Sequence, residues 1–197
     1  MVEKYYKTKR LLLIPPNIHL SSKILDFYVR NMDFFKSYDP YRPNIFYSLS
    51  AHKGIIKKEL KDIKSGRMLK FWIFSMDEMI DSKGNIIKKV NKNKIIGMIS
   101  FSNIVRGNLL SCTVAYKLDK DETKKGYMLE ALDFAINIVF KDLKLHRIEA
   151  NIMPRNRASI KLVKRLGFNY EGTAQKYLKI NGEWEDHIHM VKLNNNL

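Results

Sequence analysis

Cysteine is almost absent from this 197-residue chain, in which Cys112 is the only one. No disulfide can form within the chain, so the composition predicts a reducing, cytoplasmic setting. Long hydrophobic runs are also lacking, because no stretch reaches the roughly 18 apolar residues of a membrane-spanning helix. The apolar segment Leu11–Ile14 is too short for a signal peptide. We therefore expect neither a membrane protein nor a secreted one.

Acidic residues are scarce: 20 Asp and Glu stand against 36 Lys and Arg, which gives a formal net charge of +16. An anionic partner would explain this excess: nucleic acid, a ribosome surface, or the phosphates of a cofactor. A lysine- and asparagine-rich composition explains it equally well, since Lys57, Lys61 and Lys88 are scattered rather than clustered. Charge alone therefore assigns no function.

Glycine and proline are few, with 9 and 5 residues, and they form no flexible linker. Internal repeats and low-complexity blocks are lacking as well. The chain is long enough for one compact core. We therefore predict a single domain over residues 1–197.

Hydrophobic periodicity predicts a mixed α/β (α+β) sheet with helices packed on it. The predicted strands are residues 10–14, 69–76, 94–101, 110–116, 147–152, 169–179 and 184–191. The predicted helices are one capped by Ser21 or Ser22, then residues 50–64, 127–140 and 157–166. Turn chemistry is expected at residues 82–85 and 180–182. In strand 110–116 the small residues Ser111, Thr113 and Ala115 share one face, which would let a ligand approach the backbone closely or simply suit core packing.

The segment 123–128 joins a predicted strand to a helix. Backbone N–H groups at a helix start lack partners, and the helix dipole favours an anion there. Gly126 removes side-chain bulk where a pyrophosphate would approach, and Lys124 and Lys125 add positive charge. An ordinary turn before a helix explains the same glycine. The segment is neither a Walker loop nor a Rossmann glycine motif.

A second segment, residues 154–159, precedes the next helix. Asn156 is placed as an N-cap, and Ser159 would be the third helical residue. A plain capped helix explains both residues. In a functional interpretation, Asn156 binds an amide of a ligand, the Ser159 hydroxyl protonates a leaving group, and Arg155 and Arg157 meet phosphate.

Other chemistries find no support in the sequence. The five histidines and Cys112 have no zinc-ligand spacing, so we expect no metal site. No Gly-x-Ser-x-Gly or His-Glu-x-x-His motif occurs. Cys112 lies in an apolar strand and is expected to be unreactive.

The order of these motifs resembles that of GNAT acetyltransferases, within them the RimJ/RimL type that acetylates the N-terminal amines of ribosomal proteins. The segment GYMLEAL at 126–132 resembles the pyrophosphate loop and following helix of the family. The other matching segments are TKRL at 8–11, HRIEAN at 146–151, NRAS at 156–159, LGF at 166–168, EG at 171–172 and, nearest to the RimJ branch, FSNIVRG at 101–107 and NGEWEDH at 181–187. Residues 31–40 resemble the substrate-side helix connection of the family. The match spans nearly the whole chain. One departure is Lys124, which stands where RimJ-like proteins usually have glycine; contacts at that position are mainly to the backbone.

The resemblance implies the GNAT fold, with splayed central strands and flanking helices. It places acetyl-CoA, the cosubstrate, in a V-shaped opening between strands 110–116 and 147–152. Backbone groups of strand 110–116 would polarise the thioester, and the loop at Gly126 would hold the pyrophosphate. The residues implied for the cofactor are Val114, Tyr116, Lys124, Lys125, Gly126, Tyr127, Met128, Asn156 and Ser159.

The resemblance further implies direct attack by a primary amine, since no activated nucleophile is visible. The catalytic candidates are Ser159, Asn156 and Tyr177, and the substrate-side candidates are Asn103, Arg106, Glu130 and Asp186. The candidates for the general base are Glu130, Asp186, His187 and Tyr177.

The expected acceptor is the N-terminal alanine or serine amine of a protein, such as a ribosomal protein. A small-molecule amine is the alternative acceptor. A third hypothesis is that the chain is a non-enzymatic ribosome- or RNA-binding protein. The chain would act as a monomer or a homodimer.

Overall fold

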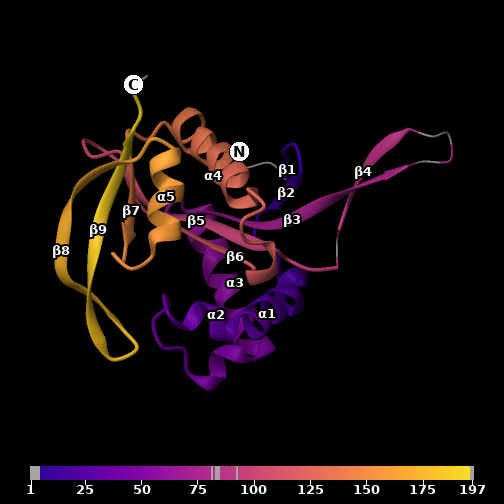
Figure 1. The fold of residues 1–197 in the computed structure, drawn as a ribbon, viewed down its shortest axis with the longest axis horizontal. Helices are drawn as coiled ribbons and strands as arrows, with labels where there is room; N and C mark the ends of the chain where they lie inside the picture. The colour runs from indigo at the N-terminus through magenta and orange to yellow at the C-terminus, as the bar shows by residue number, and fades with distance from the viewer. Residues whose placement is uncertain (1–4, 81, 83–84, 92, 196–197) are drawn as a thin grey trace.

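The computed structural model describes residues 5–80, 82, 85–91 and 93–195. The described strands form one nine-stranded sheet with helices packed against it (Figure 1), which confirms the predicted mixed α/β class. The elements are β1 (Tyr6–Lys7), β2 (Leu11–Ile14), η1 (Ile18–Leu20), α1 (Ser21–Arg30), α2 (Met32–Lys36), η2 (Asn44–Tyr47), α3 (Leu49–Lys64), β3 (Leu69–Ile80), β4 (Ile86–Val90), β5 (Gly97–Val105), β6 (Ser111–Leu118), η3 (Lys120–Glu122), α4 (Tyr127–Lys141), β7 (Arg147–Ile152), α5 (Arg157–Arg165), β8 (Asn169–Ile180) and β9 (Glu183–Leu193).

The order of strands across the sheet is β1-β2-β3-β5-β6-β7-β9-β8, and β4 pairs with β3 outside this path. The neighbours are antiparallel except β6 and β7, which run parallel. Parallel neighbours need a crossover connection, and α4 lies in the connection between β6 and β7. The parallel pair therefore lies in the interior of the sheet, with antiparallel strands on both sides.

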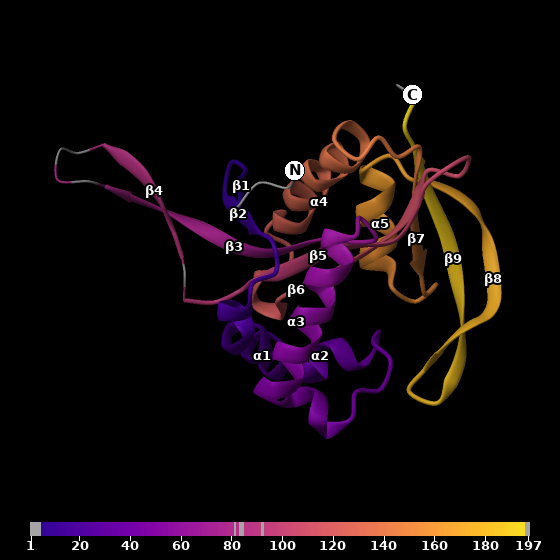
Figure 2. The ribbon, with the colours of Figure 1, turned by 180° about the vertical axis from the view of Figure 1, so that it is seen from behind.

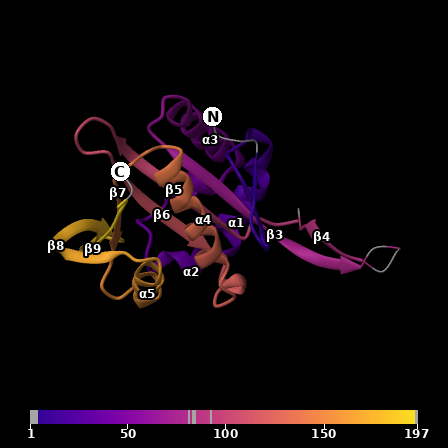
Figure 3. The same cartoon turned by 90° about the horizontal axis from the view of Figure 1, so that it is seen from above.

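Helices cover both faces of the sheet (Figures 2 and 3). Alternation along β3 explains this, because Phe71 and Ile73 pack in one apolar cluster while Trp72 and Phe74 pack in another. The Trp72 cluster includes residues of α1 and α3, and the Phe71 cluster includes residues of α4 and α5. No helix in the described part of the chain is long and apolar enough to cross a membrane.

The predicted serine cap of the first helix is wrong. Leu20 occupies the N-cap position without a side-chain hydrogen bond, and Ser21 is already helical and buried. The reason is that η1 runs directly into α1, so the polar cap stands before η1 instead: Asn17 Oδ1 accepts the His19 N–H at 3.0 Å. The five-residue α2 was not predicted; its Phe35 is buried.

The β3–β4 arm extends farther than the sequence suggested. The predicted strand 69–76 continues to Ile80 and pairs with β4, which was not predicted. This arm lacks the apolar alternation from which strands are predicted, because charged residues pair across its strands. Asp77, for example, stands opposite Lys89. Figure 1 shows the arm projecting from the body on the side opposite β8 and β9. Of the predicted turn at 82–85, residues 83 and 84 lie outside the described residues.

The last two strands form the predicted hairpin. Asn181 and Gly182 make its two-residue turn with φ of 50° and 99°, as a primed turn requires. The pairing of β8 with β9 is interrupted between Ala174 and Leu178, where Lys176 has φ of 48°. Asp186 Oδ1 accepts the Lys176 N–H at 2.7 Å and so satisfies the backbone of this bulge. The bulge places the ring of Tyr177 against His187 and His189 of β9.

Candidate active site

The parallel pair β6–β7 separates after three residue pairs. Ser111, Cys112 and Thr113 pair with the first three residues of β7, and the described ladder ends at Glu149. Strand β6 nevertheless continues to Leu118, and β7 to Ile152. Residues 114–118 of β6 and 150–152 of β7 therefore present backbone edges to each other without mutual hydrogen bonds. We call this segment the strand opening.

Tyr116 links β6 to α5 beside the strand opening. Its hydroxyl donates to the Ser159 carbonyl at 3.4 Å. Burial raises the pKa of Tyr116 to about 12, so the phenol stays neutral and remains a donor. Of the predicted cofactor residues, the structure thus places Val114 and Tyr116 on the open edge and Ser159 directly across from them.

The loop before α4 has the backbone geometry of an anion site. Lys124 and Gly126 have φ of 63° and 77°, and Gly126 occupies the N-cap position of α4 without a side-chain cap. The first N–H groups of a helix have no intrahelical acceptor, so those at Tyr127 and Met128 are available to a ligand. A diphosphate can use these donors and the helix dipole together.

Arg10 contributes a charge to this loop that the sequence reasoning missed. Its guanidinium donates to the Lys125 carbonyl at 3.0 Å and lies 4.8 Å from the centroid of the Tyr127 ring. The guanidinium is held by Glu130, with Arg10 Nε 2.7 Å from Glu130 Oε2. The sequence signal was its place in segment 8–11, which resembles the opening of the family's domain.

Glu130 was predicted on the substrate side, but the structure places it under Arg10. Burial alone would raise the pKa of Glu130, and the hydrogen bonds from Thr8 and Arg10 outweigh this effect and hold it below the usual range. Such a carboxylate is a poor proton acceptor. Its geometry is that of an anchor for the arginine at the loop.

Asn103 and Arg106, also predicted on the substrate side, lie elsewhere. The register pairs Ser102 with Thr113 and Val105 with Ser111, which is the closed end of the β6–β7 pair. Arg106 donates to the Leu143 carbonyl. The structure therefore does not bring these two residues to the strand opening.

The start of α5 confirms the capping prediction. Asn156 Oδ1 accepts the Ser159 N–H at 3.2 Å, which is the N-cap interaction expected for the third helical residue. Gly167, with φ of 79°, ends the helix as predicted. The Ser159 hydroxyl has no hydrogen-bond partner among the described residues and is half-buried, so it is free to act on a ligand.

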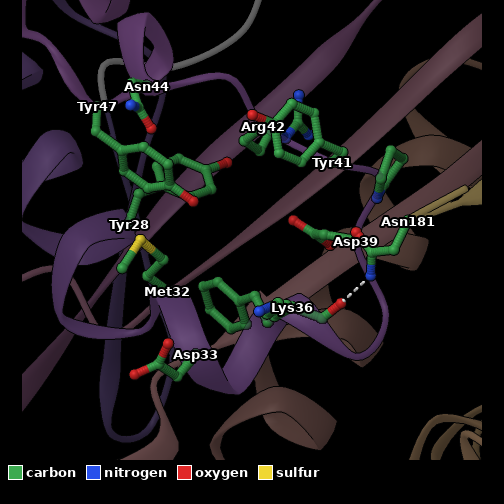
Figure 4. A pocket seen from close by; sticks show the side chains of 12 residues that line it. Tyr28, Met32, Asp33, Lys36, Asp39, Tyr41, Arg42, Asn44, Tyr47 and Asn181 are labelled. Atoms are coloured by element: carbon green, nitrogen blue, oxygen red, sulfur yellow. Dashed lines mark hydrogen bonds between the residues drawn. The ribbon is translucent and has the colours of Figure 1, made fainter.

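A pocket of about 220 Å³ lies below the sheet, between α1, α2 and the loop that follows them (Figure 4). Asn181 reaches it from the turn of the β8–β9 hairpin. Its lining mixes aromatic, charged and amide side chains: Tyr28, Met32, Asp33, Phe35, Lys36, Asp39, Pro40, Tyr41, Arg42, Asn44, Tyr47 and Asn181.

The segment 36–39 that borders this pocket is tied to three other elements. Asn181 Nδ2 donates to the Lys36 carbonyl at 2.6 Å, and Arg155 Nη2 donates to the Ser37 carbonyl at 3.1 Å. Lys117 of β6 forms an ion pair with Asp39, while Arg155 also pairs with Glu185 of β9. These contacts connect the pocket to both strands of the opening, because Lys117 lies on β6 and Arg155 follows β7.

A sheet whose central parallel pair separates, with a glycine loop at the start of the crossover helix, defines the class of acyltransferases with the GNAT fold. The chain belongs to the GNAT acetyltransferase family, since the model of the acetyltransferase (GNAT) domain matches residues 10–169. It is an N-acetyltransferase of the RimJ/RimL type, as the sequence motifs implied.

Similar proteins share most of their length with this chain. The probable N-acetyltransferase YjcK of Bacillus subtilis is 32% identical over 95% of this chain and 96% of its own. The ribosomal protein uS5-alanine N-acetyltransferase of Escherichia coli is 34% identical over 84% of this chain and 78% of its own. The crystal structure of the ribosomal-protein-S5-alanine acetyltransferase of Vibrio fischeri superposes with a TM-score of 0.86 at 31% identity, covering 98% of both chains.

Proposed function

We propose that this protein transfers the acetyl group of acetyl-CoA to the N-terminal α-amine of a protein, with alanine or serine at its first position. The observation that carries the proposal is the strand opening, whose unpaired β6 edge leads to the loop at Gly126. A pantetheine arm carries amides that can pair with such an edge, and its diphosphate can bind at the helix start. The acyltransferase relatives named for alanine acetylation support the choice of acceptor.

The proposed reaction is direct transfer. The only cysteine is a poor nucleophile, because burial raises the pKa of Cys112 to about 12. Backbone N–H groups at Val114 and Tyr116 would polarise the thioester carbonyl. The Ser159 hydroxyl, free of partners in the described structure, would protonate the departing thiolate.

Amine chemistry favours an N-terminal acceptor. The α-amino group has a pKa of about 7.7–8.0 and the lysine ammonium one of about 10.4. Deprotonating lysine at neutral pH therefore takes about 3–4 kcal/mol more. The pocket beside the opening, with its volume of about 220 Å³, has room for the first residue or two of an extended peptide.

Charge in the pocket argues against a small cationic acceptor. Asp33 and Asp39 would attract one, but Lys36 and Arg42 line the same pocket and Lys117 neutralises Asp39. A purely RNA-binding role would leave the strand opening and the Gly126 loop without a purpose.

The test is a panel of acceptors with acetyl-CoA. Peptides beginning with Ala or Ser should release CoA, and the same peptides with a blocked N-terminus but a free lysine should not. Turnover on polyamines or aminoglycosides with silence on every peptide would refute the proposed acceptor. Salt-dependent RNA binding without any turnover would favour the non-enzymatic alternative.

A further inference from the structure

The acceptor amine arrives as an ammonium ion and must lose a proton before it attacks, so the proposed function requires a base. Two of the four sequence candidates are already engaged. Glu130 holds Arg10, as described above. Asp186 accepts the Lys176 N–H and, as the strand neighbour of His187, points to the other face of the sheet.

Tyr177 is placed to orient its neighbours rather than to take a proton. Its hydroxyl accepts from Asn151 Nδ2 at 3.2 Å. Its ring lies 5.3 Å, between centroids, from the imidazole of His187 and 5.3 Å from that of His189. Asn151, Tyr177, His187 and His189 thus form one group, which we call the Tyr177 cluster.

His187 has the tautomer that a base needs. Its Nδ1 lies 3.1 Å from the Glu185 carbonyl oxygen, and a carbonyl can only accept, so the proton is on Nδ1. In the neutral imidazole the lone pair is then on Nε2, for which the described residues supply no hydrogen-bond partner. His187 as a whole is 4% exposed, so the orientation of its ring is fixed by packing.

The register places the Tyr177 cluster on the pocket side of the strand opening. Thr113 pairs with Glu149 on the same face, so two residues further along Ala115 and Asn151 share that face too. Asn151 is the register partner of His189, and His187 follows with the same alternation. Lys117 of β6, on this face as well, binds Asp39 at the pocket. Thr113 is half-buried and Ala115 is exposed, so the small residues of β6 leave this face of the strand uncovered.

Two further atoms of the cluster call for a polar ligand. Asn151 Oδ1 and His189 Nε2 are both enclosed, and neither has a hydrogen-bond partner among the described residues. Leaving a buried polar atom unsatisfied costs about 1–3 kcal/mol. A water held within the cluster would satisfy such an atom.

We propose that His187 Nε2 is the proton acceptor of the reaction, with Tyr177 and Asn151 as positioning residues; this assignment rests on the proposed function. The ammonium gives one proton to Nε2, and the neutral amine attacks the thioester carbon. The C–N bond forms and the C–S bond breaks. The second amine proton goes to the sulfur by way of the Ser159 hydroxyl, and the imidazolium returns its proton to solvent.

The test uses His187→Asn, because the asparagine amide can still donate to the Glu185 carbonyl but has no basic nitrogen at the position of Nε2. Each variant is assayed with two forms of one peptide acceptor. One form has its natural α-amine, and the other begins with an aminooxyacetyl group, whose nitrogen is already unprotonated at neutral pH. Turnover on the α-amine should fall about 10²–10⁴-fold. Turnover on the aminooxy form should change little, and the KM for acetyl-CoA should not move.

Equal losses on both acceptors, or no loss on either, would overturn the assignment. His187→Gln is assayed in parallel, so that a folding defect in one variant does not decide the outcome. His19→Asn serves as the matched control, because His19 is an exposed histidine of η1 outside the site. A wild-type chain that acetylates neither acceptor would refute the proposed function instead, which keeps the two failures distinct.

Discussion

Asn156 and Ser159 lie in the same helical turn but differ in what their side chains are free to do. Asn156 Oδ1 is occupied by the Ser159 N–H, so its first role is to stabilise the start of α5. The Ser159 hydroxyl has no partner among the described residues, and its carbonyl already binds Tyr116 across the opening. Stability and turnover should therefore depend on different members of this pair.

Substitution by alanine separates the two roles. Asn156→Ala should lower the free energy of unfolding by about 1 kcal/mol, as loss of an N-cap does. Ser159→Ala should leave the melting temperature unchanged and reduce kcat by about 10²-fold, as loss of a proton donor does. Thermal denaturation and steady-state kinetics measure the two effects. Ser48→Ala, which removes the N-cap of α3, is the control for stability alone. A Ser159→Ala enzyme of full activity would contradict the proton-donor role.

Single residues were predicted well where the signal was local. The Asn156 cap and the Gly167 helix end follow from backbone chemistry within a few positions, and both are confirmed. Arg10 and Glu130 could not be predicted, because their partnership joins positions 120 residues apart. Glu130 was a substrate-side candidate, whereas in the folded chain its carboxylate forms an ion pair with Arg10.

At the scale of elements, periodicity identified the strands and helices that bury an apolar face. It missed β4, whose described residues are mostly exposed, and α2, which is only five residues long. The bulge in β8 also escaped prediction, and with it the position of Tyr177 against the two histidines. The position of a β-bulge depends on the pairing with the neighbouring strand. The residues of the bulged strand alone therefore do not predict it.

Asp119 shows how two elements are joined by one buried charge. Its fully buried carboxylate pairs with Arg30 of α1 at 2.7 Å and accepts the Asp121 N–H of η3. Burial raises its pKa, and the hydrogen bonds from Arg30 and Asp121 outweigh this and lower it overall. A lowered folded pKa means that the stabilisation is complete above the unfolded value of about 3.9 and is lost as the pH falls through the folded value.

Asp119→Asn should therefore cost about 3 kcal/mol at neutral pH, as breaking a buried ion pair does. The difference from wild type should shrink as the pH drops below about 4. Urea unfolding between pH 7 and pH 3 measures both. Asp62→Asn breaks the exposed pair with Arg67 and should cost less than about 1 kcal/mol throughout. A pH-independent difference for Asp119→Asn would show that the carboxylate charge is not the cause.

Arg155 connects the loop after β7 to the pocket and to β9. Arg155→Ala removes both the bond to the Ser37 carbonyl and the pair with Glu185, which should loosen segment 36–39. Loss of a charged hydrogen bond of about 1.5 kcal/mol corresponds to a roughly tenfold rise in the KM for the acceptor peptide. The KM for acetyl-CoA should stay the same. Arg165→Ala, at the exposed far end of α5, is the control. A rise in both KM values of Arg155→Ala would argue against a role confined to the pocket.

At the scale of the whole molecule, the family and fold were predicted from ordered motifs rather than from composition. The strand opening itself is a long-range feature, yet it was predicted because the motifs on both its sides were recognised together. The pocket itself was not predicted, although residues 31–40 were matched to the family's substrate-side helix connection; the rest of its lining comes from segments that are separate in the sequence, including Asn181 at the far hairpin.

Binding of acetyl-CoA should stabilise the folded chain as a whole. A ligand at a concentration of about 100 times its Kd adds about 2.7 kcal/mol. For a chain of this size each kcal/mol raises the melting temperature by roughly 2–4 °C, so a rise of about 5–11 °C is expected. Acetyl-pantetheine, which lacks the diphosphate, should give a smaller rise. No rise with acetyl-CoA at any concentration would contradict the proposed cosubstrate.

The three residue pairs that join β6 to β7 have a mechanical consequence. With so few hydrogen bonds between β6 and β7, the sheet can twist at this boundary, here called the seam, without losing ladder hydrogen bonds elsewhere. The half that contains β7, β8 and β9 is then held to the rest largely by side-chain packing under α4 and α5. A molecule wedged into the seam would stiffen the protein as it binds, so occupancy and rigidity should rise together.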